Sequence, residues 1–348
     1  MSFIDKQWCQ VTCSWYRGCQ LGKSILCLFS VFGINLFLCC RQFRSKRKPV
    51  SKIDSKDPRP VVPLDANLSP APWSSLLRPV LFTAAFSGGS LAACAIWQYE
   101  NMRSEAIRVK TEGWGWKREG RRKVGEFREM VRKWWTGLSE GEKLYWPLCG
   151  ANILVFLAWR IPSLQPFMMK WFLGNPAAKA TCLPLLLSAF SHYSLLHLGA
   201  NMMVLHSFMP TGVALLGKEQ FLAVYLNACV ISSLASMVYK VGMRNTSFSL
   251  GASGAICTVL SMFAVFFPDA KLSIIFLPMY TFSAASAVKG LMLIDSAGLV
   301  FRWSFFDHAA HLSGMLFGMF WAKEGCSGIW GQREGLVTAW HKLRNSYD

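Results

Sequence analysis

Residues 180–217 read ATCLPLLLSAFSHYSLLHLGANMMVLHSFMPTGVALLG, and they contain no Asp, Glu, Lys or Arg over 38 positions. About 20 apolar residues suffice for a helix that crosses a bilayer, so one helix cannot use the whole stretch. We therefore expect a loop followed by a membrane span at about Leu195–Val213. The composition of the whole chain agrees, because only 16% of its 348 residues are charged, against about 25% in an ordinary soluble domain.

Six further stretches are apolar enough for membrane spans. They are Val80–Tyr99, Leu144–Ile161, Phe221–Val238, Leu250–Phe267, Leu272–Leu293 and His308–Ala322. Lys289 falls inside the span at 272–293, and we expect it to face protein, water or a headgroup, because burying its charge in lipid costs at least ~2.5–3.5 kcal/mol. The sequence predicts an all-α polytopic membrane protein with a six-helix core, residues 144–322, and one additional N-terminal transmembrane helix, residues 80–99.

The segments outside these spans are rich in basic residues. Residues 1–79 carry twelve Lys or Arg and four Asp or Glu, and we expect a targeting segment followed by a flexible basic linker. The apolar run Ser24–Cys40 leaves a short anchor or a signal-like core as the alternative. Residues 100–143 fit a basic amphipathic connecting segment on the bilayer surface or a solvated charged hairpin. Residues 323–348 read as a short C-terminal tail.

The charge and cysteine content exclude several functions. The net charge of +18 comes from basic residues that flank apolar spans, so we expect contact with membrane lipids and none with nucleic acid. The 12 Cys include no C-x-x-C pair, which leaves a zinc ribbon unsupported. Carboxylates are nearly absent from the predicted spans, which excludes an intramembrane aspartyl protease, and no H-E-x-x-H motif supports a zincin-type site. We expect no cofactor and no metal.

Polar side chains with catalytic chemistry lie in the first turns of three predicted spans. His197 and Asn201 lie in the second span of the core, Ser253 in the fourth and His311 in the sixth. Because consecutive spans alternate in direction, these three run parallel, and their N-terminal turns share one membrane depth. The topology therefore predicts a hydroxyl, two imidazoles and an amide in one layer.

Helical spacing lines two faces of these spans with small residues. The faces are His311–Gly314–Gly318 and Ser253–Cys257–Ser261. Such faces let two membrane helices approach closely, which a Ser–His pair requires because the hydroxyl and the ring nitrogen must be about 2.6–3.2 Å apart. An ordinary packing seam shows the same pattern, and spacing alone leaves both interpretations open.

His197 and Asn201 are one helical turn apart, so their side chains can aim at one point. Ser253 would add its backbone N–H at a helix start, where unsatisfied donors and the positive end of the helix dipole gather. Together these groups fit an oxyanion hole for a tetrahedral intermediate. The alternative is that Asn201 only bridges two helices.

At these residues the sequence resembles the rhomboid family of intramembrane serine proteases. The matching motifs, in the family's order, are His197-x-x-x-Asn201, Gly251-Ala252-Ser253-Gly254 and Ala310-His311-x-x-Gly314-x-x-x-Gly318. The extra span before the core and the stretch Phe306-Asp307-His308-Ala309-Ala310-His311 are similar to the mitochondrial branch. The resemblance runs from about Val80 to the C-terminus and departs from the family at Ser313, where a glycine is expected.

The resemblance implies a Ser–His dyad in a multi-pass protein of the mitochondrial inner membrane. Ser253 would be the nucleophile and His311 the general base and acid, while His197 and Asn201 would stabilise the oxyanion. The implied substrates are single-span membrane proteins, whose helix must unwind near the cut site to expose a peptide bond. No cofactor is implied.

Two neighbours of His311 complete the expectations. The implied dyad needs no aspartate, and Asp307, one turn earlier at i−4, is a weak candidate for orienting His311. His308 would line a water-accessible cavity or cap the helix.

Two other functions stay open as alternatives. A metal-binding channel or transporter would use four histidines as ligands: His192, His197, His308 and His311. An inactive rhomboid-like chaperone would bind the same kind of membrane protein without cutting it. The membrane orientation also stays open, because basic residues lie on both sides of the first span.

Overall fold

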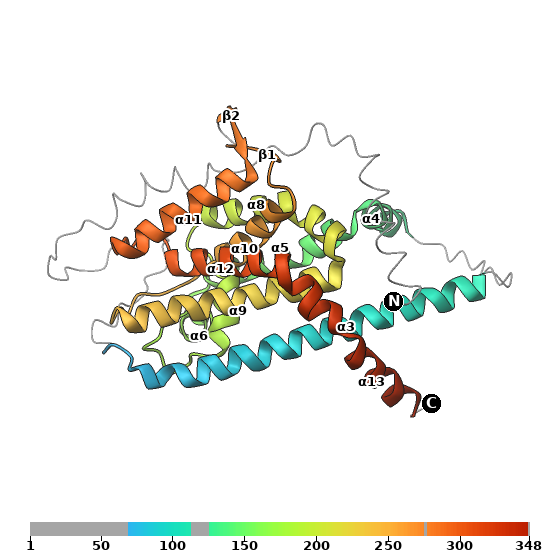
Figure 1. The fold of residues 1–348 in the computed structure, drawn as a ribbon, viewed down its shortest axis with the longest axis horizontal. Helices are drawn as coiled ribbons and strands as arrows, with labels where there is room; N and C mark the ends of the chain where they lie inside the picture. Colours follow the sequence, from blue (N-terminus) through green and yellow to red (C-terminus); the bar gives the residue numbers. More distant parts are fainter. Residues whose placement is uncertain (1–68, 113–124, 275–276, 347–348) are drawn as a thin grey trace.

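The computed structural model describes residues 69–112, 125–274 and 277–346. Figure 1 shows a mostly helical molecule in which one long helix runs along the side of a bundle, and two short strands stand out from the opposite side. The predicted targeting segment and most of the following linker, residues 1–68, lie outside the described residues.

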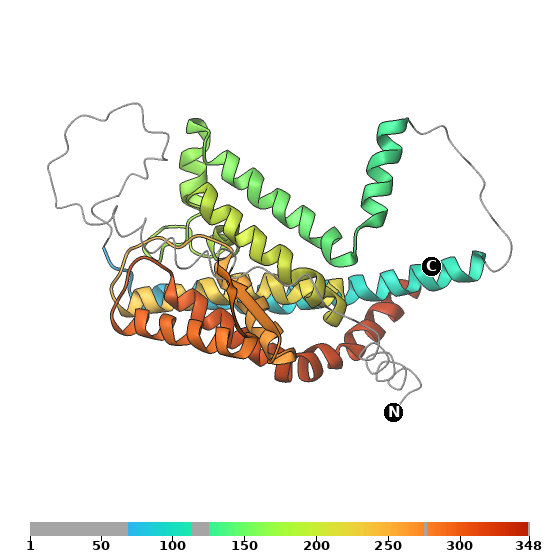
Figure 2. The same ribbon diagram turned by 90° about the horizontal axis from the view of Figure 1, so that it is seen from above.

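Two long helices lie side by side. They are α3 (Leu77–Glu112), which contains the predicted span at residues 80–99, and α9 (Lys218–Gly242). Their contact is visible in both views (Figure 1, Figure 2), and it includes a 2.9 Å hydrogen bond from Asn227 Nδ2 to Ser90 Oγ. Each is long and apolar enough to cross a membrane.

The other long helices are α5 (Glu140–Ala158), α8 (Leu195–Leu216), α10 (Ser253–Phe266), α11 (Ala284–Val300) and α12 (His308–Phe320). Shorter helical elements are η1 (Trp73–Leu76), α4 (Glu126–Gly137), η2 (Pro162–Leu164), α6 (Gln165–Trp171), α7 (Leu183–Leu187), η3 (Ser188–Phe190), η4 (Trp321–Ile329), η5 (Trp330–Gln332) and α13 (Glu334–Asn345). Among the described elements α10 is central, because it contacts α8, α9, α11 and α12 and every residue from Gly254 to Ala264 is buried.

A strict criterion of helix length and composition gives fewer membrane spans among the described residues than the one plus six that the sequence predicts. Of the described helices, α3 and α9 satisfy it, and α5 joins them if α5, η2 and α6 form one span bent by 99°. Helices occupy all or part of the other predicted spans, but they do not meet this criterion. The helical membrane fold is therefore supported, while the count of one plus six spans stays a prediction.

Small residues bring α10 and α12 into backbone contact. A Cβ atom on Gly314 would collide with the carbonyl oxygen of Gly254, and one on Gly318 would collide with that of Thr258. Two hydroxyls use this proximity: Thr258 Oγ1 donates to Gly314 O and Ser261 Oγ donates to Met315 O, both at 2.8 Å. The predicted face of Gly314 and Gly318 thus makes the contact, while α10 contributes Gly254 and Thr258, one position after the predicted Ser253 and Cys257, together with the predicted Ser261.

The span expected at Leu272–Leu293 is wrong at its N-terminal half. Residues Lys271–Ile274 (β1) and Leu277–Ser283 (β2) form an antiparallel hairpin, and the helix α11 starts only at residue 284. The sequence of this stretch is rich in β-branched and aromatic residues, which suit a strand, and Pro278 would remove a backbone hydrogen bond from the interior of a helix. Ser283 then caps α11 by accepting a 3.2 Å hydrogen bond from Ser286 N. The helix α11 then runs to residue 300, beyond the predicted end of this span at residue 293.

The connecting segment 100–143 is not one amphipathic helix. Its first part extends α3 to residue 112, α4 is a separate helix without buried residues, and α5 already begins at residue 140. The early start of α5 has a local cause, a capping box in which Ser139 and Glu142 each accept from the other's backbone N–H.

Residues 323–348 do more than form a tail. The helix that begins with α12 continues as a π-helical segment, η4, and after a short turn α13 packs against α3. Figure 1 shows α13 lying against α3 near the C-terminus of the chain.

Candidate active site

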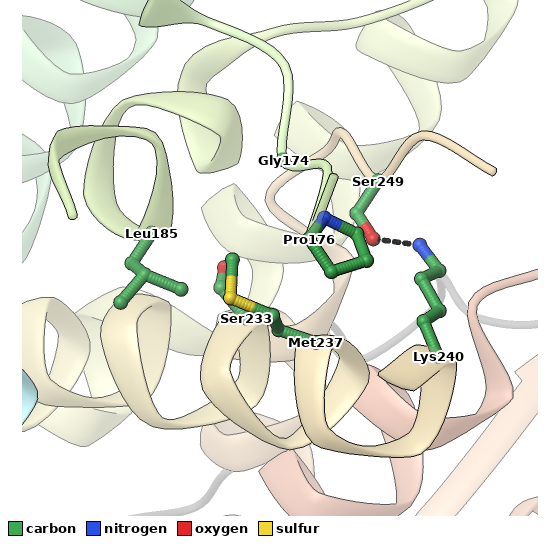
Figure 3. Close-up of a pocket in the computed structure, with 7 residues that line it drawn as sticks. All are labelled: Gly174, Pro176, Leu185, Ser233, Met237, Lys240 and Ser249. Carbon is green, nitrogen blue, oxygen red and sulfur yellow. Dashed lines mark hydrogen bonds between the residues drawn. The ribbon is translucent and has the colours of Figure 1, made fainter. Parts of the chain in front are cut away.

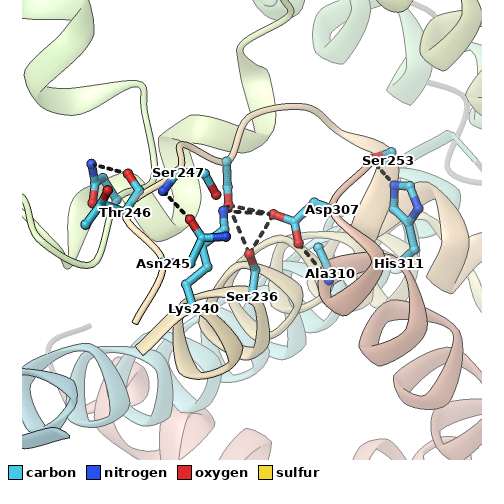
Figure 4. A network of polar contacts seen from close by, with 11 residues as sticks. Ser236, Lys240, Asn245, Thr246, Ser247, Ser253, Asp307, Ala310 and His311 are labelled. Carbon is cyan, nitrogen blue, oxygen red and sulfur yellow. Dashed lines mark hydrogen bonds and ion pairs between the residues drawn. The ribbon is translucent and has the colours of Figure 1, made fainter. Parts of the chain in front are cut away.

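Ser253 and His311 form a hydrogen-bonded pair between α10 and α12. His311 Nε2 lies 2.8 Å from Ser253 Oγ, and Figure 4 shows the imidazole directed at the hydroxyl. Ser253 is the first residue of α10, and His311 lies in the first turn of α12, where it is 2% exposed. Such a separation allows direct proton transfer between hydroxyl and imidazole. The two side chains that the topology predicted at one depth therefore touch.

Gly251 shapes the loop that leads to Ser253. Its φ of +120° lies in the region that favours glycine, and a Cβ there would come within 2.9 Å of the His197 ring. Gly251 N also donates to Ser188 O at 2.9 Å, which ties the loop to η3. Only glycine thus lets the backbone pass this close to His197 while it delivers Ser253 to the start of α10.

The structure places the two predicted oxyanion residues differently. The half-buried His197 ring lies against Gly251, two residues before Ser253. Asn201 is buried on the next turn of α8, and its Nδ2 donates to the carbonyl oxygen of His197 at 2.8 Å. His197 is therefore adjacent to the nucleophile loop, whereas the amide of Asn201 already makes one bond within its own helix and has one N–H left to offer.

Asp295 is a neighbour of the pair that the sequence pattern did not identify. Its Oδ1 lies 3.4 Å from His311 Nδ1 and 2.7 Å from His308 Nδ1, and the residue is 4% exposed. His311 consequently lies between a hydroxyl on one side and a carboxylate on the other. The predicted span ended at residue 293, so Asp295 fell outside it; a helix begun at the Ser283 cap would have included it.

His308 and Asp307 have roles other than those expected. His308 is 3% exposed and hydrogen-bonds Asp295, so it neither lines an open cavity nor caps the helix. Asp307 is the residue that caps α12, because its Oδ1 accepts from Ala310 N at 3.2 Å. Asp307 therefore fixes the start of the helix that carries His311, while the carboxylate beside the imidazole is that of Asp295.

The four histidines considered as metal ligands separate into two pairs. The rings of His192 and His197 pack edge to face with centroids 5.0 Å apart, while His308 and His311 meet at Asp295. Within residues 69–112, 125–274 and 277–346, no group of three or more His, Cys, Asp or Glu is placed to hold a metal ion.

Comparison with known proteins extends these observations. Residues 179–327 match a family model described as the rhomboid domain, and this range contains all four predicted site residues. The chain is 47% identical over 283 residues to presenilin-associated rhomboid-like protein, mitochondrial, of Homo sapiens, an alignment that covers 80% of this chain and 74% of that protein.

Two more distant relatives show how far the similarity reaches. Presenilin-associated rhomboid-like protein A, mitochondrial, of Danio rerio is 43% identical over 308 residues, which cover 83% of this chain and 79% of the relative. Rhomboid protein 1, mitochondrial, of Saccharomyces cerevisiae is 35% identical over 200 residues, 57% of this chain and 58% of the relative. The similarity thus extends well beyond the matched domain in the vertebrate relatives.

Proposed function

Because the chain belongs to the rhomboid family, we propose that it is an intramembrane serine endopeptidase with Ser253 as nucleophile and His311 as general base and acid. The observation that supports this most directly is the 2.8 Å contact between Ser253 Oγ and His311 Nε2. Its substrates are single-span membrane proteins of the mitochondrial inner membrane. The mitochondrial names of the relatives and the basic N-terminal segment of this chain support that location.

The reaction follows from the groups around Ser253. His311 takes the hydroxyl proton as Ser253 attacks the scissile carbonyl, and it later protonates the leaving amine. The imidazolium formed in between faces Asp295, whose carboxylate stabilises that charge. A water then attacks the acyl-enzyme, with His311 again as the base.

The oxyanion is stabilised by donors gathered at the start of α10. Ser253 contributes its backbone N–H at the positive end of the helix, and His197 lies beside the same loop. Asn201 contributes its second amide hydrogen, because the first is bonded to the carbonyl oxygen of His197. Each donor of this kind is worth ~2.7–4 kcal/mol of barrier.

The amphipathic helix α4 provides a contact with membrane lipids. Phe127, Met130 and Trp134 project from one side of it and are 72%, 60% and 49% exposed. Arg132 and Lys133 lie on the charged side of the same helix. An apolar face beside basic residues is the arrangement that lies flat in the headgroup region of a bilayer.

Replacement of the nucleophile tests the proposal. In Ser253→Ala protein reconstituted with a single-span substrate, we expect cleavage to fall ~10⁴-fold or more, because the acyl-enzyme cannot form. A fluorophosphonate should label the wild-type protein at Ser253 and leave the variant unlabelled. The measurements are product formation on gels and mass spectrometry of the labelled peptide.

A matched control separates loss of the nucleophile from loss of a hydroxyl. Ser313→Ala removes a hydroxyl two residues after His311 that donates within its own helix, to Ala310 O, and this variant should cleave at the wild-type rate. Substantial cleavage by Ser253→Ala would contradict the proposal. Substrate binding without cleavage by the wild-type protein would instead favour the chaperone alternative.

A further inference from the structure

A second polar cluster lies beside the catalytic pair and joins three segments of the chain. We call Ser236, Lys240, Ser249 and Asp307 the Lys240 cluster (Figure 4). Asp307 Oδ2 accepts hydrogen bonds from Ser236 Oγ at 2.6 Å and from Ser249 Oγ at 2.5 Å, and it lies 3.4 Å from Lys240 Nζ. Lys240 Nζ also donates to Ser249 Oγ. One carboxylate and one ammonium group thus connect α9, the loop before α10 and the start of α12.

The ion pair in this cluster is withdrawn from water. The side chains of Lys240 and Asp307 are 8% and 20% exposed. Desolvation of two such charges offsets much of their attraction, so the pair is weak evidence for a contribution to stability. What its bonds do is fix the position of the start of α12 relative to α9.

The space next to Lys240 is too small for a substrate. A cavity of about 10 Å³ lies between Lys240, Ser249 and mainly apolar neighbours such as Leu185 and Met237 (Figure 3), which is room for about one water molecule. Lys240 Nζ donates to Ser249 Oγ, and Ser249 Oγ itself donates to Asp307 Oδ2, so Lys240 is not placed to accept the Ser249 proton. The cluster is therefore not a second catalytic dyad.

Its place in the sequence links the cluster to both catalytic residues. Ser249 lies four positions before Ser253, and Asp307 lies four positions before His311. Asp307 uses its second oxygen, Oδ1, to cap α12. The backbone of Ser249 is held as well, because its N–H and C=O pair with Gly174 at 2.8 and 2.9 Å. A change at Lys240 would therefore reach both the nucleophile loop and the helix that carries the base.

We propose that Lys240 is a positioning residue for the proteolytic site. Its contacts with Asp307 and Ser249 hold the start of α12 and the nucleophile loop in the register that brings His311 Nε2 to Ser253 Oγ. The inference rests on the proposed function, because it concerns the reactivity of the same Ser–His pair. Misplacement of reacting groups by about 1 Å can cost ~100-fold in rate. A change in the relative position of Ser253 and His311 should therefore be seen as a slower reaction of Ser253.

Lys240→Met tests this role, because it keeps an unbranched side chain and removes the charge. We expect the rate constant for fluorophosphonate labelling of Ser253 and kcat for a single-span substrate to fall ~10- to 100-fold, with KM changed by less than about twofold. The fraction of protein labelled at completion should stay at the wild-type level. A purely structural role would lower that fraction and the Tm, and leave the rate constant of the folded molecules unchanged.

Lys218→Met is the matched control, at the other end of α9. It removes a 2.8 Å ion pair with Glu140 that lies at the protein surface, and its labelling rate should equal that of the wild type. Lys240→Met leaves Asp307 without its cation, so a second variant combines it with Asp307→Asn, which removes both charges and keeps a capping side chain on α12. This double variant should fold and still react slowly.

The outcomes distinguish the two proposals. Labelling at the wild-type rate in either Lys240 variant overturns the inference and leaves the proposed function intact. Failure of the wild-type protein to be labelled at Ser253 defeats the proposed function itself.

Discussion

The imidazole of His311 lies between two oxygen atoms, Ser253 Oγ at 2.8 Å from Nε2 and Asp295 Oδ1 at 3.4 Å from Nδ1. A carboxylate in this place holds the ring in one tautomer and stabilises the imidazolium. Asp295→Asn preserves the shape and removes the charge, and we expect kcat to fall ~10- to 1,000-fold with KM nearly unchanged, because only the charged intermediate is affected. The measurement is steady-state cleavage of a single-span substrate in vesicles.

The fall of kcat in Asp295→Asn should be smaller than in an enzyme whose aspartate bonds a single histidine. Asp295 also hydrogen-bonds the buried His308 at 2.7 Å, so its charge is shared between two rings. Asp269→Asn is the control, because this carboxylate is exposed in the loop after α10 and its variant should match the wild type. If Asp295→Asn matched it too, His311 would be oriented without the carboxylate.

At the level of elements, the backbones of α10 and α12 are in direct contact, and glycine makes this approach possible. Gly314→Ala would drive a methyl group into the carbonyl oxygen of Gly254, and we expect the free energy of unfolding to fall by ~1–3 kcal/mol, as in other overpacked interiors. Labelling of Ser253 should slow as well, because the same seam sets the separation of Ser253 and His311. Chemical unfolding and labelling kinetics provide the two measurements.

Gly290→Ala is the control for Gly314→Ala, because Gly290 also lies inside a helix, α11. No atom lies within 4 Å of a Cβ built at Gly290, so the substitution should raise stability by ~0.5–1 kcal/mol through the better helix propensity of alanine. Equal effects of the two alanines would show that backbone proximity between α10 and α12 contributes nothing.

The same elements show what the sequence could predict. The small residues on the faces of His311 and Ser253 indicated the contact between their helices, because helical periodicity is a local property. Hydrophobicity could not distinguish strand from helix in the uncharged run before residue 284, so the hairpin and the position of Asp295 in α11 were missed. The Lys240 cluster joins residues 236, 249 and 307, and no local pattern marks contacts over such separations.

On the scale of the whole molecule, the C-terminal helix returns to the additional N-terminal helix. Trp340 Nε1 donates to Glu100 Oε1 at 2.9 Å, Arg344 pairs with the other oxygen of Glu100, and Arg333 Nε donates to Gln98 Oε1 at 3.0 Å. The side chains of Glu100 and Arg344 are 32% and 35% exposed. Solvent therefore weakens this contact.

Glu100→Ala removes the shared acceptor of Trp340 and Arg344, so α13 should detach from α3 more often. We expect trypsin to cut after Lys342 and Arg344 ~2- to 5-fold faster in the reconstituted variant, a small effect because the lost contacts are exposed to solvent, as measured by mass spectrometry of the released peptides. Cleavage of substrate should not change, because these bonds lie between α13 and α3 and not at α10 or α12. Glu105→Ala is the control, since Glu105 pairs with Arg108 within α3; identical trypsin rates in both variants would mean that Glu100 does not hold the C-terminal helix.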